Sequence, residues 1–335
     1  MIFSPLVRLL LTALALVWIA GCTTPPEQPQ PTSGAETAWD SQLERWPPVD
    51  ALLLGEQHDA AAHQQWQRHT VQWLAARQRL AALVLEMAPE GAGTDGLPPD
   101  ADAAQVRAAL QWDEQAWPWD RYAPVVMAAV AAGVPVRGGN LPRSQMPQAM
   151  RDAALDTHLP PAALAAVIDR HDPVLVVLAG GAAGVRVGGF NRPRSQRPQA
   201  LRAAALHPHR PPAALARPRT AIEEGHCGLV PAQRLMPMVR IQLARDARMA
   251  RAVQAAHRPG RTVLLVAGFG HVQRSLGVPT WLPSDFTSKV AIAQAGQARA
   301  AIESEADYVH RTPALTPHDP CAELRERWSG PPSAP

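Results

Sequence analysis

Residues 50–58, Asp-Ala-Leu-Leu-Leu-Gly-Glu-Gln-His, decide the fold class of this chain. The apolar run at 51–54 ends at Gly55, which makes it too short for a helix and typical of a strand buried on both faces. Similar apolar runs follow at 83–87 and 262–267, and both predict further buried strands.

Helical stretches separate these strands. The sequence predicts a shorter strand at 134–136. It predicts helices at 59–79, 103–111, 124–132 and 229–257. Short apolar strands that alternate with helices indicate an α/β fold, a mainly parallel sheet with helices on both faces in a single domain. In such sheets, ligands bind beyond the carboxyl ends of the strands.

Composition excludes two classes of protein. The 335 residues are 47% hydrophobic and carry a formal net charge of +3, which excludes a disordered polar chain. The arginines are scattered among Asp and Glu without a basic stripe, so we expect no nucleic-acid partner. Proline is in excess, with 35 residues, but the predicted strands at 51–54, 83–87 and 262–267 contain none.

The amino-terminal residues predict export. Residues 1–21 read as a signal peptide, with Arg8 followed by an apolar run at 9–19 that is too short to span a membrane. The sequence Ile-Ala-Gly-Cys at 19–22 resembles a bacterial lipobox, which implies fatty acylation of Cys22 and a lipid anchor in the cell envelope, in the outer membrane and facing the periplasm. An ordinary signal peptide with an incidental Cys22 is the alternative. Residues 22–41 are rich in Pro, Gln, Thr and Ser and predict a tether.

An internal repeat interrupts the domain predicted at 42–305. Residues 120–126 recur as 169–175 and residues 140–145 recur as 191–196, which indicates a tandem duplication inserted at about 169–217. In the second copy, arginine replaces apolar residues of the first, and we expect this degraded copy to lie outside the core. Residues 306–335 are expected to form a tail. Cys227 and Cys321 remain either bonded or free, because sequence gives no Cα separation.

Ionisable residues follow the predicted strands and form the candidate site. Glu56 and His58 come after the first strand, with Gly55 expected to permit a tight exit, while Glu86 and His271 occupy similar positions on other strands. His226 is a further candidate, for which a structural role is the alternative. By contrast, His63 and His69 are expected on a solvated helix face.

Several short motifs together resemble a known family. They are, in chain order, Leu-Leu-Gly-Glu-Gln-His at 53–58, Leu-Val-Leu-Glu-Met at 83–87, Trp-Asp-Arg-Tyr at 119–122, Gly-His-Cys at 225–227, the helix segment 238–246, Gly-Phe-Gly-His at 268–271 and Gly-Val-Pro at 277–279. The set resembles the ChaN family of haem-binding lipoproteins, of a superfamily that includes erythromycin esterases and Tiki metalloproteases. The resemblance covers about 49–282, apart from the duplicated segment.

This resemblance implies an exported protein that binds haem in iron or haem acquisition. It implies an iron-ligating tyrosine with a histidine near the propionates, and possible pairing of haems in a homodimer. Of the two tyrosines, Tyr122 lies in a matched motif and Tyr308 does not. The implied haem-binding residues are therefore Tyr122, His58, His226 and His271. Arg121 would help to lower the pKa of Tyr122, and a packing role is the alternative for that tyrosine.

Two other functions remain open. Glu56, His58, Glu86 and His271 suit a Zn²⁺ or Mn²⁺ site or an acid-base site, either of which could hydrolyse an ester or amide. A purely scaffolding lipoprotein is the third possibility, and it leaves the carboxylates at the strand ends without a role.

Overall fold

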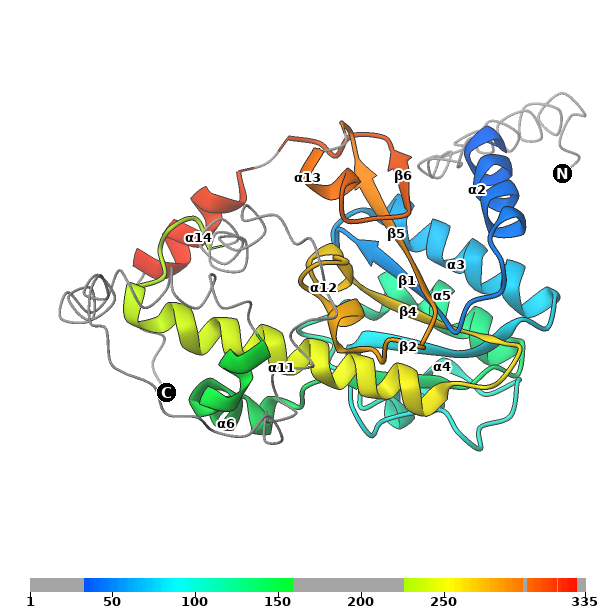
Figure 1. Ribbon diagram of the computed structural model, residues 1–335, viewed down its shortest axis with the longest axis horizontal. Coiled ribbons are helices and arrows are strands. Elements are labelled where there is room, and N and C mark those ends of the chain that lie inside the picture. Colours follow the sequence, from blue (N-terminus) through cyan, green and yellow to red (C-terminus); the bar gives the residue numbers. More distant parts are fainter. Residues whose placement is uncertain (1–32, 159–225, 298–299, 318, 330–335) are drawn as a thin grey trace, which may run out of the picture.

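The computed structural model describes residues 33–158, 226–297, 300–317 and 319–329 (Figure 1). Cys22 and the duplicate predicted at 169–217 lie outside these residues. Within the described part, no helix is both long and apolar enough to cross a membrane.

The chain forms one sheet of six parallel strands, which confirms the predicted α/β class. The spatial order is β3-β2-β4-β1-β5-β6. The strands are β1 (Ala51–Glu56), β2 (Leu80–Pro89), β3 (Val136–Asn140), β4 (Thr262–Gly268), β5 (Ser288–Ala295) and β6 (Tyr308–Thr312). β4 lies between β1 and β2, so the ends of these three strands lie side by side.

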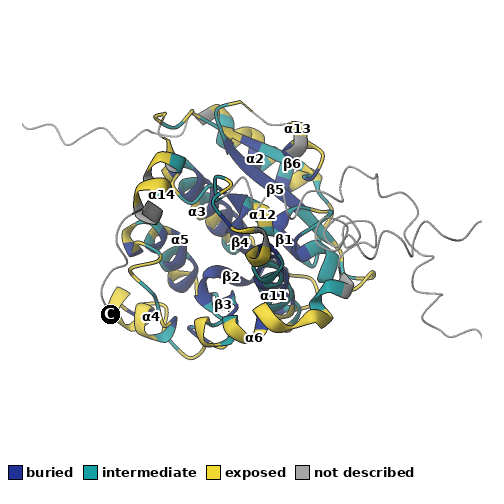
Figure 2. Ribbon diagram, turned by 90° about the vertical axis from the view of Figure 1, so that its left-hand side faces the viewer, coloured by how far each residue is buried: buried dark blue, intermediate teal, exposed yellow. Residues whose placement is uncertain are grey.

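Helices cover both faces of the sheet. α2 (Ser33–Arg45), α3 (Ala61–Ala76), α4 (Ala103–Ala109) and α5 (Trp119–Ala131) contribute to the core on one face, while α11 (Ala232–Ala256) and α12 (Phe269–Val272) contribute to the core on the other. The central strands are buried beneath these layers (Figure 2).

Successive residues of each central strand point to opposite cores, as strand geometry requires. Leu52 and Leu54 belong to the α3 side, whereas Ala51 and Leu53 belong to the α11 side. This alternation explains the continuous apolar runs, since both faces of the sheet are covered. The shorter elements are α6 (Met146–Arg151), α13 (Ala300–Glu303), α14 (Pro320–Ser329), η1 (Arg143–Gln145), η2 (Ala153–His158) and η4 (Val278–Trp281).

The structure extends the folded domain beyond both predicted boundaries, residues 42 and 305. The tether was predicted to reach residue 41, but α2 begins at Ser33 and its Trp39 is fully buried against the core. The tail was predicted to begin at residue 306, but β6 adds an edge strand to the sheet and Tyr308 packs against Trp39. The domain therefore includes aromatic contacts between two segments that both looked peripheral in sequence.

Two local expectations also change. His63 is buried, with its Nδ1 3.0 Å from the backbone N–H of Gln57, so it does not lie on a solvated face. Gly55 lies within β1 and leaves space for α12, because a Cβ there would be 2.5 Å from Val272 Cγ2. Its role is close packing of the helix on the strand, not a tight exit.

The two remaining cysteines are bonded to each other. Cys227 and Cys321 form a disulfide with a Cα–Cα distance of 5.5 Å. This bond ties the segment before α11 to α14, two elements separated by 94 residues.

Candidate functional site

Four of the predicted site residues meet at the carboxyl edge of the sheet. Glu56 ends β1, where it pairs in register with Gly268 of β4, and Glu86 lies in β2 on the other side of β4. His271 follows β4 in α12, and its Nε2 lies 3.4 Å from Glu86 Oε1. The strand order brings these groups together, as the ligand rule for parallel sheets predicts.

Glu56 is a buried carboxylate whose two oxygens are both occupied. The hydroxyl of Tyr122 donates to Oε1 at 2.8 Å, and His58 Nδ1 lies 2.8 Å from the same oxygen. The side-chain amides of Gln64 and Gln67, one helical turn apart on α3, donate to Oε2 at 2.6 and 2.7 Å. This network holds Glu56 in one orientation and fixes the tautomer in which His58 Nδ1 carries a proton.

His58 is the accessible member of the cluster. Its side chain is 39% exposed, against 3% for Glu86 and 11% for His271. The ring lies edge-on against Trp117 at 4.8 Å between centroids, and Arg121 donates to the backbone oxygen of His58 at 2.6 Å. Burial acts to lower the pKa of His58, but the hydrogen bond to Glu56 and the charges of both glutamates raise it.

Gly268 leaves open the space next to His58 Nε2. A Cβ at this position would lie 2.9 Å from Nε2 and 3.5 Å from Glu86 Oε2. Any other residue would therefore press on the imidazole. The glycine lets the imidazole lie close to the end of β4, with Nε2 3.9 Å from Glu86 Oε2.

A third carboxylate, Asp246 of α11, extends the cluster on its buried side. Asp246 Oδ1 lies 2.6 Å from His271 Nδ1, so His271 is held between Asp246 and Glu86. In the sequence, Asp246 stands out only as the last residue of the helix segment 238–246 that resembles the family. The signal that could have found it is an acid on the apolar face of a helix, since Met249, Ala250 and Val253 follow at the helical spacing and are buried.

Burial and pairing set the charges of Glu86, His271 and Asp246, the inner part of the cluster. Burial acts to lower the pKa of His271, but Glu86 and Asp246 raise it to about 10. For Glu86, burial acts to raise the pKa, but His271, His58 and the N–H of Gly268 hold it far below its usual range. Burial raises the pKa of Asp246 to about 6 against the opposing effect of His271. At neutral pH the inner part is therefore an imidazolium between two carboxylates.

Two expectations for haem ligands do not match the geometry. Tyr122 is fully buried, and burial together with Glu56 and Glu86 raises the pKa of its phenol, so it is a neutral donor and not an accessible tyrosinate. Arg121 acts in the predicted direction but is outweighed. The second expectation concerns His226, which lies beside the disulfide, before α11 begins at Ala232. Asp246, the residue of α11 that contacts the cluster, lies 14 residues beyond Ala232, about 21 Å along the helix axis.

The cluster does not fit a Zn²⁺ or Mn²⁺ ion in this arrangement. The oxygens of Glu56 accept four hydrogen bonds from protein groups, and His271 uses both ring nitrogens on carboxylates. Among the described residues, no three His, Cys, Asp or Glu side chains are grouped so that they could hold a metal ion. The donors are paired with one another, so we propose no protein-bound metal ion here.

Comparison with known proteins agrees with this architecture. The family described as haem-binding uptake, Tiki superfamily, ChaN matches residues 42–173 and 177–282, and so includes most of the segment predicted to be a duplicate. A solved structure, "Cofacial heme binding to ChaN of Campylobacter jejuni", covers 82% of this chain and 90% of its own at 20% identity and a TM-score of 0.50, a likeness in fold. No curated protein matches the chain. Since the family match spans most of the sequence, the chain belongs to the ChaN family of haem-binding uptake proteins in the Tiki superfamily.

Proposed function

We propose that this protein binds haem at the carboxyl edge of its sheet, with His58 as the iron ligand, in iron or haem acquisition. The observation that carries the proposal is the setting of His58: Nδ1 is held by the buried Glu56, the side chain is 39% exposed, and Nε2 lies 3.9 Å from Glu86 Oε2, too far for a hydrogen bond to it. A metal-ligating histidine characteristically has its other nitrogen held in this way by a carboxylate or carbonyl, which fixes the ring and raises its basicity.

The surroundings of His58 suit a porphyrin better than those of Tyr122. His58 is partly exposed beside the half-buried Trp117, which offers an apolar surface for a flat ring. Tyr122 would have to leave both the core and its hydrogen bond to Glu56 before its oxygen could reach iron. Haem, when bound, would supply the iron that the family transports, and the chain would supply an oriented imidazole.

A hemin titration of the protein from residue 23 onward tests this proposal. His58→Gln keeps a donor for Glu56 but removes the imidazole, and we expect hemin affinity, read from the Soret band, to fall about tenfold or more. Gly268→Ala should act similarly by blocking Nε2. His257→Gln is the matched control, since His257 is 32% exposed and pairs with Asp50 at 2.9 Å, before the start of β1.

The same titration separates the two candidate ligands. Tyr122→Phe should leave the position of the Soret band unchanged, because Tyr122 supports Glu56 and does not contact iron in the proposal. A spectrum altered by Tyr122→Phe and unaffected by His58→Gln would refute histidine ligation and restore the tyrosine predicted from the family motif.

We also propose that the chain is an exported lipoprotein, anchored at the outer membrane through Cys22. The lipobox-like sequence at 19–22 supports this, and the Cys227–Cys321 disulfide is consistent with an oxidising compartment such as the periplasm. Cys22→Ser should abolish incorporation of labelled palmitate and release the protein into the soluble periplasmic fraction. Unlabelled wild-type protein in that fraction would contradict the anchor.

A homodimer is the assembly that we propose for the haem-bound state. Cofacial haem binding, described for the Campylobacter jejuni protein, requires two haems face to face, and two copies of this chain would supply one each. Sedimentation with and without hemin tests this, with dimerisation expected only in the presence of hemin.

An acid-base hydrolase is the second candidate, favoured by the Glu56–His58 pair. A partly exposed histidine oriented by a buried carboxylate has the arrangement of a general base. Hydrolysis of p-nitrophenyl acetate by hemin-free protein, lost in His58→Gln and retained in His257→Gln, would support this activity. Equal rates in all three proteins would exclude a role for His58 in hydrolysis of this ester.

A further inference from the structure

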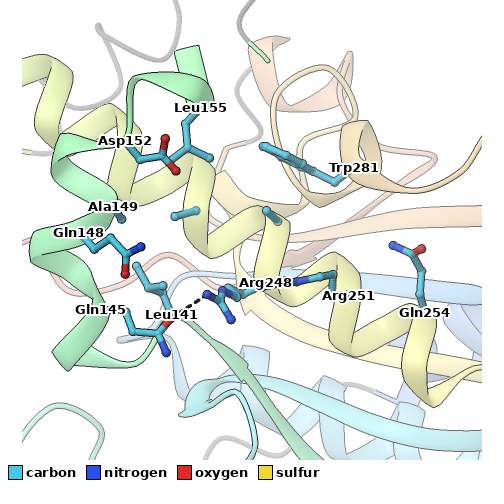
Figure 3. Close-up of a pocket in the computed structure, with 12 residues that line it drawn as sticks. Leu141, Gln145, Gln148, Ala149, Asp152, Leu155, Arg248, Arg251, Gln254 and Trp281 are labelled. Atoms are coloured by element: carbon cyan, nitrogen blue, oxygen red, sulfur yellow. Dashed lines mark hydrogen bonds between the residues drawn. The ribbon is translucent and has the colours of Figure 1, made fainter. Parts of the chain in front are cut away.

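A cavity of about 380 Å³ lies between α6 and α11, apart from the haem site proposed above. Leu141 and Ala149 line it on the β3 and α6 side, and Trp281 lies across from them (Figure 3). Arg248 and Arg251 enter it from α11. Its volume falls within the range of small-molecule sites in proteins.

The spacing of residues on α11 separates this cavity from the cluster at the strand ends. Ala247 and Arg248 lie three and four residues after Ala244, and Arg251 lies four and three residues after them, so all four share one face of the helix. Asp246, which contacts His271, lies on a different face. The small side chains of Ala244 and Ala247 leave the space that larger residues would fill.

Positive charge collects at one end of the cavity. Arg248 and Arg251 share a single carboxylate, Glu90, and Arg248 also donates to Gln145 at 2.7 Å. The pair between Arg251 and Glu90 is loose, at 3.6 Å, and the Arg251 side chain is 57% exposed. A guanidinium has five N–H donors, so Arg251 retains donors that can be directed to a ligand.

Asp152, the acidic residue that lines the cavity, lies away from the two arginines. Asp152 lies near Leu155, across from the two arginines (Figure 3). Its Oδ1 accepts from the backbone N–H of Ala154 at 3.0 Å, and its charge also acts on Arg240. The arginine end therefore keeps a net positive charge, next to apolar walls.

We infer that this cavity binds a small aromatic carboxylate, with the acid group on Arg251 and Arg248 and the ring among Leu141, Ala247 and Trp281. Guanidinium groups bind carboxylates through charge-assisted, often bidentate hydrogen bonds. An indole ring offers a flat surface on which an aromatic ring can lie in offset or edge contact. Neither contact uses the haem-binding residues.

Isothermal titration with naphthalene-2-carboxylate tests the inference, with naphthalene-2-carboxamide as the uncharged control ligand. We expect the carboxylate to bind about tenfold more tightly than the amide, since the charge-assisted hydrogen bonds are lost with the charge. Arg251→Gln should weaken carboxylate binding by a similar factor. Arg311→Gln is the matched control, because Arg311 is exposed and pairs with one carboxylate, that of Glu303, at 3.0 Å.

Two further measurements separate this site from the haem site. Ala247→Phe fills the cavity and should abolish carboxylate binding, with hemin affinity and thermal stability measured on the same sample to show that the variant is folded. Saturating hemin should leave the carboxylate affinity unchanged. No binding by wild-type protein, equal binding of acid and amide, an unaffected Arg251→Gln variant or displacement by hemin would each overturn the inference.

Discussion

Buried histidines occur in two regions of this protein and acquire opposite properties. His271 lies between Glu86 and Asp246, and these carboxylates raise its pKa to about 10. His63 and His310 lie in the aromatic region formed by α2, α3 and β6, where burial lowers both pKa values to about 4. Burial is the main cause of the low pKa values of His63 and His310, whereas at His271 two adjacent carboxylates outweigh burial.

The partners in the aromatic region explain its neutrality. His310 stacks on Trp66 with the ring planes 5° apart, and His63 Nε2 lies 3.0 Å from the hydroxyl of Thr312. None of these contacting partners is charged, and the opposing effect of Asp59 on His63 is outweighed by burial and by His310. The comparison teaches that the local set of neighbours, and not depth in the core, determines whether a histidine can serve as a charged group.

Glu86→Gln should have the largest effect, because it removes a charge that compensates the buried His271 imidazolium. Breaking a buried ion pair by neutralising one partner is strongly destabilising, and we expect a loss of about 3 kcal/mol in the free energy of unfolding, measured by urea denaturation at pH 7. Glu114→Gln is the control: the same change in an exposed pair with Arg107 should lose less than about 1 kcal/mol. Equal losses would contradict the charged state of His271.

The aromatic region predicts an acid-sensitive stability. The folded pKa of His63 is below its unfolded value of about 6.5, so the unfolded state binds more protons and stability falls as the pH falls below 6.5. Between pH 6.5 and 5 this amounts to about 1.6 kcal/mol for His63. Urea denaturation at both pH values should show a smaller acid loss in His63→Gln than in wild type. Parallel pH profiles would refute a neutral His63.

Asp246→Asn should weaken the charged region less than Glu86→Gln, because burial already disfavours the Asp246 carboxylate, whose pKa is raised to about 6, whereas Glu86 also compensates His58 and accepts from the N–H of Gly268. We expect a loss of about 1.5 kcal/mol at pH 7, in the range of a hydrogen bond to a charged group. The raised pKa of His271 stabilises the fold below pH 6.5, and this contribution is lost as the pH rises toward 10. The variant should therefore lower the pKa of His271, measured by NMR titration; an unchanged pKa would contradict the role given to Asp246.

The smallest effect is expected for His69→Gln at the edge of the aromatic region. His69 forms a partly exposed pair with Asp40 at 2.6 Å, and its loss should cost less than about 1 kcal/mol. Its charge helps to lower the pKa of His310, so the variant should raise that pKa slightly in an NMR titration. A lower pKa would show that His69 does not act on His310 through its charge.

Sequence predicted β1, β2 and β4 but not β5 and β6, and the strand predicted at 134–136 overlaps β3 only at Val136. The continuous apolar runs in β1, β2 and β4 are typical of strands covered on both faces. β5 has alanine at alternate positions between Lys289 and Gln294, which weakens its apolar signal, and β6 has only five residues, among them His310 and Arg311. Whether such weakly patterned segments form strands depends on pairing with partners distant in sequence, which periodicity cannot report.

The candidate functional site could likewise be predicted only in part from the sequence. The positions of Glu56 and His271 could be predicted because the ends of parallel strands share one edge of the sheet. The contact between Asp246 and His271 depends on the rotation of α11, and the burial of Tyr122 depends on the packing of α5. Both are set by tertiary packing, so sequence could place Tyr122 near the site but could not say that its hydroxyl donates to Glu56.

The docking of α2 limits how far a lipid-anchored domain can stand from its bilayer. Because Trp39 holds the helix on the core from Ser33 onward, 11 residues separate that point from Cys22, a span of at most about 40 Å. A tether reaching residue 41 would allow nearly twice that span. In the anchored state proposed above, a partner that received haem from this protein would have to approach close to the membrane surface, and lengthening the segment before Ser33 would vary that distance.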